Sequence, residues 1–139
     1  MTSEFLTNRD DFEYWLSSMD EFLEQMLEVF PESDQHRLDY SPESLDVVEN
    51  WVLSKYKKID DILVPSESQL ANCIACYVGE TFRKKLGAKW DIRFDDPSFA
   101  YHALPILTWG KESDCPLTIV TAAIDRRTGK FFRTLLENA

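Results

Sequence analysis

The sequence predicts an α+β fold with three N-terminal helices, then a short antiparallel sheet, then a C-terminal element that is helical or a hairpin. Two observations carry this prediction. Apolar residues recur at helical spacing through about the first 86 residues, and after Gly87 they alternate with polar residues as in a strand. The length of 139 residues, without repeats or linkers, predicts a single domain over residues 1–139.

The first predicted helix begins near Asp10 and ends before Pro31. Its apolar residues step by three or four positions from Phe12 to Phe30, which places them on one face. Asp10 and Asp11 lie where a carboxylate meets the positive end of the helix dipole, and Pro31 ends the helix. The same apolar face would also serve a dimer interface, so a homodimer is one expectation.

The second and third helices are predicted from their terminal residues. Ser41 is a suitable N-cap, and Pro42 suits the first helical position. The third helix begins at Pro65 or Ser66, and Gly87 is a natural residue for the position after its end.

Strand periodicity follows. KWDIRF (89–94) alternates apolar and charged residues, and ALPILTWG (103–110) is a second short strand. In the tail, over residues 116–137, Pro116 and Gly129 frame a helix, which is the favoured interpretation. A hairpin around DRRTG is the alternative.

The charge is distributed very unevenly. The formal net charge is −10, of which residues 1–34 carry −9, with Arg9 as their one base. Phosphates bind basic surfaces, so we expect no nucleic-acid partner. The chain has no apolar run of roughly 18 residues, which argues against a membrane span, and its N-terminus lacks the features of an export signal. Three cysteines, an odd number, argue against a disulfide framework, and together these features predict a cytoplasmic protein.

Acidic residues form a line on the first predicted helix. Asp20, Glu24 and Glu28 are spaced at i, i+4 and i+8, and Glu13 precedes them. Like charges at this spacing destabilise an isolated helix by about 0.2–0.5 kcal/mol per pair. One interpretation is a solvated face that keeps the protein soluble. The other is a docking surface for a basic protein, since such a field speeds association.

The motifs for catalysis or metal binding are weak. Cys73 and Cys76 form C-x-x-C in the middle of a predicted helix, where two small side chains packing into the core are the favoured explanation. His36 and His102 are isolated from any recognisable nucleophile setting. We therefore expect no metal site, no cofactor and no enzyme activity.

The stretch YVGETFRKKLGAKW (77–90) predicts a corner from helix to strand. Gly79 inside a helix indicates close contact with another element, and Glu80 is placed to pair with Arg83 or Lys84 one turn later. Trp90 then begins the returning strand. The alternative is that Glu80, Arg83 and Trp90 form a pocket for a small ligand.

A second polar cluster lies in the tail. Asp125, Arg126 and Arg127 precede Gly129, and we expect their ion pairs to orient the tail against the corner at residues 80–90.

YVGETFRKKLGAKW resembles a signature, YxGExxRKxLGxxW, of small uncharacterised bacterial domains. PLTIVTAAIDRRTGKFFRTLL resembles their C-terminal segment, and LDYSPESLDVVENWVL extends the resemblance. Such domains are similar in size and charge to immunity proteins of bacterial toxin systems. The resemblance implies a binding function and supplies no catalytic residue. It marks these signature positions: Tyr77, Gly79, Glu80, Arg83, Gly87, Trp90, Asp125 and Arg127.

From the sequence we therefore expect a non-enzymatic domain that binds another, basic protein through Asp20, Glu24, Glu28 and Glu13, as an immunity-type inhibitor would. A domain that binds a small ligand, or a regulatory domain, is the alternative.

Overall fold

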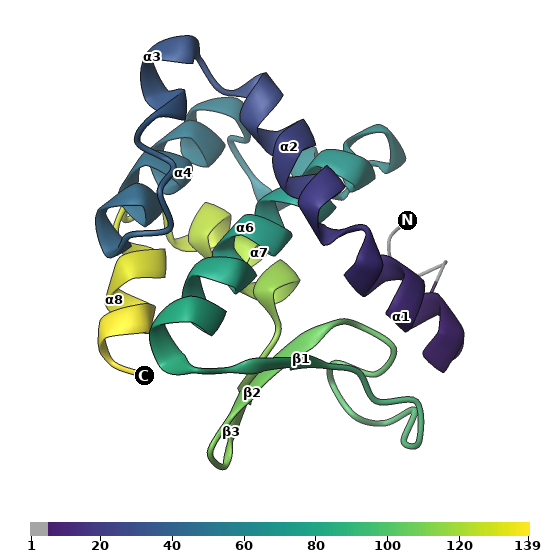
Figure 1. Cartoon of the computed structure of the whole chain (residues 1–139). Helices are drawn as coiled ribbons and strands as arrows, with labels where there is room; N and C mark the ends of the chain where they lie inside the picture. Colours follow the sequence, from purple (N-terminus) through teal and green to yellow (C-terminus); the bar gives the residue numbers. More distant parts are fainter. Residues whose placement is uncertain (1–5) are drawn as a thin grey trace.

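The computed structural model describes residues 6–139 and has an α+β architecture in which helices pack on one side of a small sheet (Figure 1). In chain order the elements are α1 (Arg9–Ser17), α2 (Met19–Val29), α3 (Glu32–Gln35), α4 (Pro42–Lys55), α5 (Ile59–Leu63), the 3-10 helix η2 (Pro65–Glu67), α6 (Ser68–Leu86), β1 (Lys89–Asp91), β2 (Ile106–Trp109), β3 (Glu112–Asp114), α7 (Pro116–Arg126) and α8 (Phe131–Glu137). The α+β class is confirmed, but the prediction of three N-terminal helices is wrong, because α1 to α6 and η2 precede the sheet.

The segment predicted as the first helix is divided into α1 and α2, so the prediction of one continuous helix is wrong. The break lies at Ser18, whose backbone has φ −92° and ψ 4°. The hydroxyls of Ser17 and Ser18 donate to the carbonyl of Tyr14, at 2.7 and 3.0 Å. Serine side chains that bond to nearby carbonyls compete with the helical ladder, which explains the break. Asn8 caps α1 by accepting from the backbone N–H of Asp11.

Helix α6 is the centre of the fold. Every residue from Ala71 to Phe82 is buried, and α2 and α7 make the most extensive contacts with it. Its predicted end is confirmed, since Gly87 follows in the left-handed conformation at φ 66°. Helix α4 begins as predicted, with Ser41 accepting from the N–H of Ser44.

The sheet has the antiparallel order β1-β2-β3 and lies below the helices in Figure 1. Trp90 pairs with Leu107, and Thr108 pairs with Ser113. Strand β1 is shorter than predicted and ends at Asp91. Strand β3 was not predicted, because its three residues are all polar and show no alternation of apolar and polar side chains.

The tail forms two helices, so the favoured helical interpretation is confirmed and the hairpin is wrong. Helix α7 ends at Arg126, and Arg127 follows it in the left-handed conformation with φ 55°. The buried carboxylate of Glu49 accepts from the N–H groups of Phe131 and Phe132, at 3.0 and 2.8 Å, and so fixes the start of α8 on α4.

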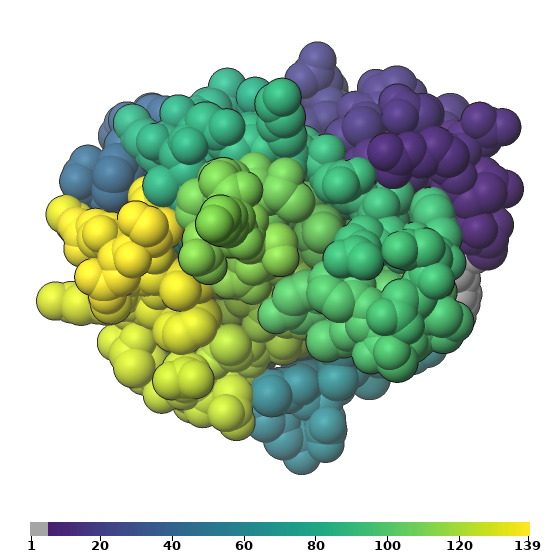
Figure 2. Space-filling model, turned by 90° about the horizontal axis from the view of Figure 1, so that it is seen from below, coloured from purple at the N-terminus to yellow at the C-terminus, as the bar shows by residue number. Residues whose placement is uncertain are grey.

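Seen from below, the strands and their connecting loop occupy the middle of the surface (Figure 2). The C-terminal helix α8 and the N-terminal helix α1 lie at opposite sides of this face. Over residues 6–139, no helix combines the length and the apolar character needed to cross a bilayer.

Candidate functional site

The acidic residues predicted to bind a partner are exposed. Asp20, Glu24 and Glu28 lie on α2, whereas Glu13 lies on α1, before the break at Ser18. None of the four forms an ion pair with another residue in the part of the chain that the structure describes. The structure therefore leaves these charges available to solvent or to a partner.

Apolar side chains accompany the acidic line. Leu27 lies one turn after Glu24 and is 38% exposed, and Val29 is 47% exposed. On α1, the aromatic side chain of Tyr14 is 76% exposed. The surface of α1 and α2 thus combines negative charge with apolar contact area, as protein interfaces commonly do.

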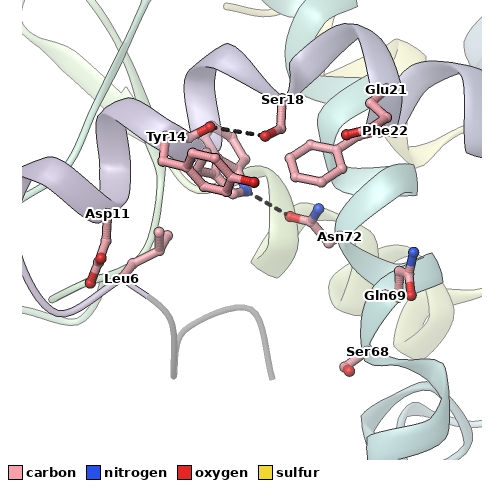
Figure 3. Close-up of a pocket in the computed structure, with 10 residues that line it drawn as sticks. Leu6, Asp11, Tyr14, Ser18, Glu21, Phe22, Ser68, Gln69 and Asn72 are labelled. Carbon is pink, nitrogen blue, oxygen red and sulfur yellow. Dashed lines mark hydrogen bonds between the residues drawn. The ribbon is translucent and has the colours of Figure 1, made fainter.

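A groove of about 620 Å³ lies beside this surface, between the junction of α1 with α2 and the first turns of α6 (Figure 3). Its lining includes Tyr14, Trp15 and Phe22 from the first two helices. From α6 it includes Asn72, which is 7% exposed and whose Oδ1 accepts from the indole Nε1 of Trp15 at 2.9 Å. This hydrogen bond joins the two walls of the groove.

The charged side chains that line the groove, among the described residues, are Asp11 and Glu21. The backbone N–H and the hydroxyl of Thr7 donate to the Asp11 carboxylate at 3.0 and 2.8 Å. These hydrogen bonds, first of all the one from the backbone, lower the pKa of Asp11 below its usual value. Asp11 is therefore ionised at neutral pH, and the groove is negatively charged.

The signature residues of the corner pack against one another. A Cβ on Gly79 would lie 2.2 Å from Cη2 of Trp90, so the close contact predicted for this glycine is confirmed. The Nε1 of Trp90 donates to Glu80 at 2.8 Å. Arg83 donates to both carboxylate oxygens of Glu80, at 2.7 and 3.0 Å, and takes the pairing that we assigned to Arg83 or Lys84.

These contacts control the ionisation of Glu80. Burial of its carboxyl group by itself would raise the pKa. The hydrogen bonds from Arg83 and Trp90 outweigh burial and hold the pKa below its ordinary value. The corner is thus an internally satisfied ion pair, and Trp90 lines a cavity of only about 20 Å³. This geometry does not support the corner as a ligand pocket.

Tyr77, another signature residue, lies away from the corner and makes contacts between helices. The hydroxyl of Tyr77 donates to Ser44 at 2.8 Å and accepts from the backbone N–H of Tyr40 at 3.0 Å. Lys84 lies over the ring of Tyr40, 5.1 Å from its centroid. Tyr77 therefore connects α6 to the start of α4.

The expected ion pairs of Asp125, Arg126 and Arg127 are wrong. Arg127 instead donates to backbone carbonyls at the end of α4, at 2.8 Å to Leu53 and 2.9 Å to both Tyr56 and Lys57. Arg126 lies over the ring of Phe131, and Asp125 forms no ion pair with any other residue between positions 6 and 139. The tail is therefore oriented against α4 and not against the corner at residues 80–90.

The cysteines lie inside the core as free thiols. Burial raises the pKa of Cys73 to about 11, and it also raises the pKa values of Cys76 and Cys115. Within residues 6–139, no three histidine, cysteine or acidic side chains gather in a way that would hold a metal ion.

Sequence reasoning missed the groove. Tyr14 and Glu21 are unremarkable within their own helices, so nothing in the sequence sets them apart. The one available signal was Asn72, a polar residue on a helix that is otherwise apolar at that point.

Comparison with known proteins places the chain in a family. A family model described as "Uncharacterised protein YwmA" matches residues 5–101. The match includes α1 through β1, and so both the groove and the corner, and it leaves out α7 and α8. No curated protein and no solved structure matches the chain. Since the match covers more than two thirds of its length, the chain belongs to the YwmA family of uncharacterised proteins.

Proposed function

We propose that this chain is a non-enzymatic cytoplasmic domain that binds another protein, and that the acidic surface of α1 and α2 docks on a basic surface of that partner. One observation carries the proposal: Asp20, Glu24 and Glu28 stand in line on α2, exposed and without a cation from the described chain to pair with them.

The energetics favour a role for this line. Each like-charged pair at this spacing costs an isolated helix about 0.2–0.5 kcal/mol, and a basic partner would remove that cost. A concentrated negative field also raises the rate of association with a positive surface. Leu27, which is 38% exposed beside Glu24, adds apolar area that a partner would bury.

The cysteine thiols support binding over catalysis. Burial raises the pKa of the Cys73, Cys76 and Cys115 thiols, so they are protonated at neutral pH and weakly nucleophilic. Buried free thiols also accord with a reducing compartment such as the cytoplasm.

Within this class we propose an immunity-type inhibitor. Its acidic surface would cover a basic surface that the partner uses for its own activity, such as the nucleic-acid groove of a nuclease toxin. Coexpression tests this directly, because the native chain should restore growth to cells that express the partner. The variant D20K/E24K/E28K should fail to restore growth while it accumulates to the same level.

Affinity capture from the native cell lysate tests the docking itself, with wild-type protein and D20K/E24K/E28K at low and high salt. Wild type should retain a basic protein at low salt. High salt should weaken this binding, and the triple variant should not retain the protein. D60K/E112K/D125K is the matched control, because these exposed acids lie elsewhere and the change in net charge is identical. Equal loss of binding in both triple variants would show an effect of net charge and would contradict the proposed docking surface.

A domain that binds a small ligand is the second candidate, and the groove of about 620 Å³ is the observation that favours it. A volume of this size suits a drug-sized molecule. A thermal-shift screen separates the candidates, since a tight small ligand raises the melting temperature in the absence of any protein partner.

A further inference from the structure

We propose that the groove between α1–α2 and α6 is an arginine subsite, which holds the side chain of an arginine in a peptide segment of the partner. The inference rests on the proposed docking function and deepens it, because it names the chemical group that the partner inserts.

The shape and the lining of the groove fit a guanidinium on its aliphatic stem. The volume of about 620 Å³ is ample for one long side chain with its flanking backbone. Tyr14, Trp15 and Phe22 supply aromatic surface on the side of α1 and α2 (Figure 3). A planar guanidinium stacks on aromatic faces and is less strongly hydrated than an ammonium, which favours arginine over lysine.

The charge of the groove also selects a cation. Asp11 and Glu21 are its charged residues among those the structure describes. The Asp11 carboxylate already accepts two hydrogen bonds from Thr7. Glu21 is exposed, and from position 6 onward no residue forms a hydrogen bond or an ion pair with its carboxylate. Glu21 is therefore the acceptor for the guanidinium, with Asp11 as a second fixed negative charge.

Asn72 indicates a peptide and not a bare cation. Its side chain is more than nine-tenths buried, and the indole of Trp15 fixes its oxygen at 2.9 Å. Figure 3 shows the nitrogen of the amide on the side of Phe22, away from that bond. No described side chain or backbone group accepts a hydrogen bond from this nitrogen. The nitrogen is therefore free to donate to a group in the groove, and a backbone carbonyl beside the inserted arginine would accept from it.

Titration of the ¹⁵N-labelled full chain with acetyl-Gly-Arg-Gly-amide tests the subsite by NMR. The peptide in which citrulline replaces arginine is the neutral, nearly isosteric control. We expect a saturable shift of the Trp15 indole N–H signal with the arginine peptide, with a dissociation constant on the order of millimolar, and no saturable shift with citrulline. Methylguanidinium, which has the cation but no peptide carbonyl, should bind more weakly than the arginine peptide.

Two matched variants locate the contact. Glu21→Gln should weaken the binding of the arginine peptide about five-fold, which corresponds to one ion pair worth about 1 kcal/mol. Glu32→Gln makes the same charge change on the neighbouring helix α3, outside both the groove and the acidic line, and it should leave the affinity within about two-fold. Both positions are exposed, so circular dichroism should show an unchanged fold.

The results separate this inference from the proposed function. Equal shifts with arginine and citrulline, or equal weakening by both variants, overturn the arginine subsite. Partner capture that depends on Asp20, Glu24 and Glu28 but not on Glu21 also overturns the subsite, while the docking function stands. Specific binding of the arginine peptide without capture of any partner supports the subsite and contradicts the proposed docking function.

Discussion

The indole ring of Trp90 lies directly on Gly79, so closely that a Cβ at position 79 would be 2.2 Å from Cη2 and 2.5 Å from Cζ2 of the ring. The same ring is held by its hydrogen bond to Glu80. Because Gly79 has no side chain, the middle of α6 leaves room for this ring, and β1 can pack back against the helix.

Gly79→Ala should destabilise the protein by about 1–2 kcal/mol. Displacing the ring costs about 1–3 kcal/mol, as overpacking usually does, and the better helix propensity of alanine offsets up to about 1 kcal/mol. Urea denaturation followed by circular dichroism measures the change. In a Trp90→Phe background the cost should be smaller, since phenylalanine lacks the two clashing atoms. A stabilising Gly79→Ala would show that the ring moves freely.

Glu80→Gln should destabilise the protein by about 1–3 kcal/mol at pH 7, because hydrogen bonds to a partly buried carboxylate are lost. The folded-state pKa of Glu80 is lowered, so its contribution is present above the unfolded value near 4.5 and is lost as the pH falls through the folded value. The difference in unfolding free energy between wild type and variant should therefore narrow on acidification. A difference that stays constant from pH 7 to pH 3 would contradict this assignment.

Glu49→Gln should also destabilise the protein by about 1–3 kcal/mol, because the amide nitrogen replaces one of the two oxygens that accept from the start of α8. Its pH dependence has the opposite sign. Burial raises the pKa of Glu49 despite the hydrogen bonds from Phe132 and Phe131, so its contribution is complete below about pH 4.5 and is lost as the pH rises through the folded value.

The test for Glu49 is the same series of denaturation curves, recorded from pH 4 to pH 8. The gap between wild type and Glu49→Gln should become smaller as the pH rises, whereas the gap for Glu80→Gln should become larger. Parallel trends for the two variants would show that at least one pKa shift has been assigned the wrong sign.

Arg127→Lys should lower the free energy of unfolding by about 1–2 kcal/mol, since an ammonium cannot reach the carbonyls of Leu53, Tyr56 and Lys57 with the geometry of the guanidinium fork. Arg126→Lys is the control, because this neighbour contacts only the ring of Phe131 among the interactions of the described chain. Thermal unfolding compares them, and equal melting temperatures for the two variants would refute the role of Arg127 at the end of α4.

Several elements could be predicted because their signals are local. Ser41 with Pro42 begins α4, and Gly87 ends α6, since capping depends on residues within one turn of the helix end. The line of Asp20, Glu24 and Glu28 was equally readable, because the spacing i, i+4 places side chains on one face of any helix.

Other features were decided by contacts between distant segments. The groove depends on Trp15 meeting Asn72, which lies 57 positions later, and Arg127 donates to carbonyls that lie 70 to 74 positions away. Neither relationship leaves a period or a spacing in the sequence. The break at Ser18 has a local cause, because the hydroxyls of Ser17 and Ser18 bond to the carbonyl of Tyr14. It was not predicted, because the apolar pattern of the sequence continues through the break.

By itself, the sequence determined the α+β class, the start of α4, the end of α6, the need for a close neighbour at Gly79, and the acidic face of α2. Each of these follows from the geometry of a single element and its side-chain chemistry. Only the tertiary structure identified Trp90 as that neighbour, turned Arg127 toward α4, and brought Glu21 and Asn72 to one groove. Such pairings depend on how the elements pack, because the fold chooses among many neighbours that local patterns leave equally possible.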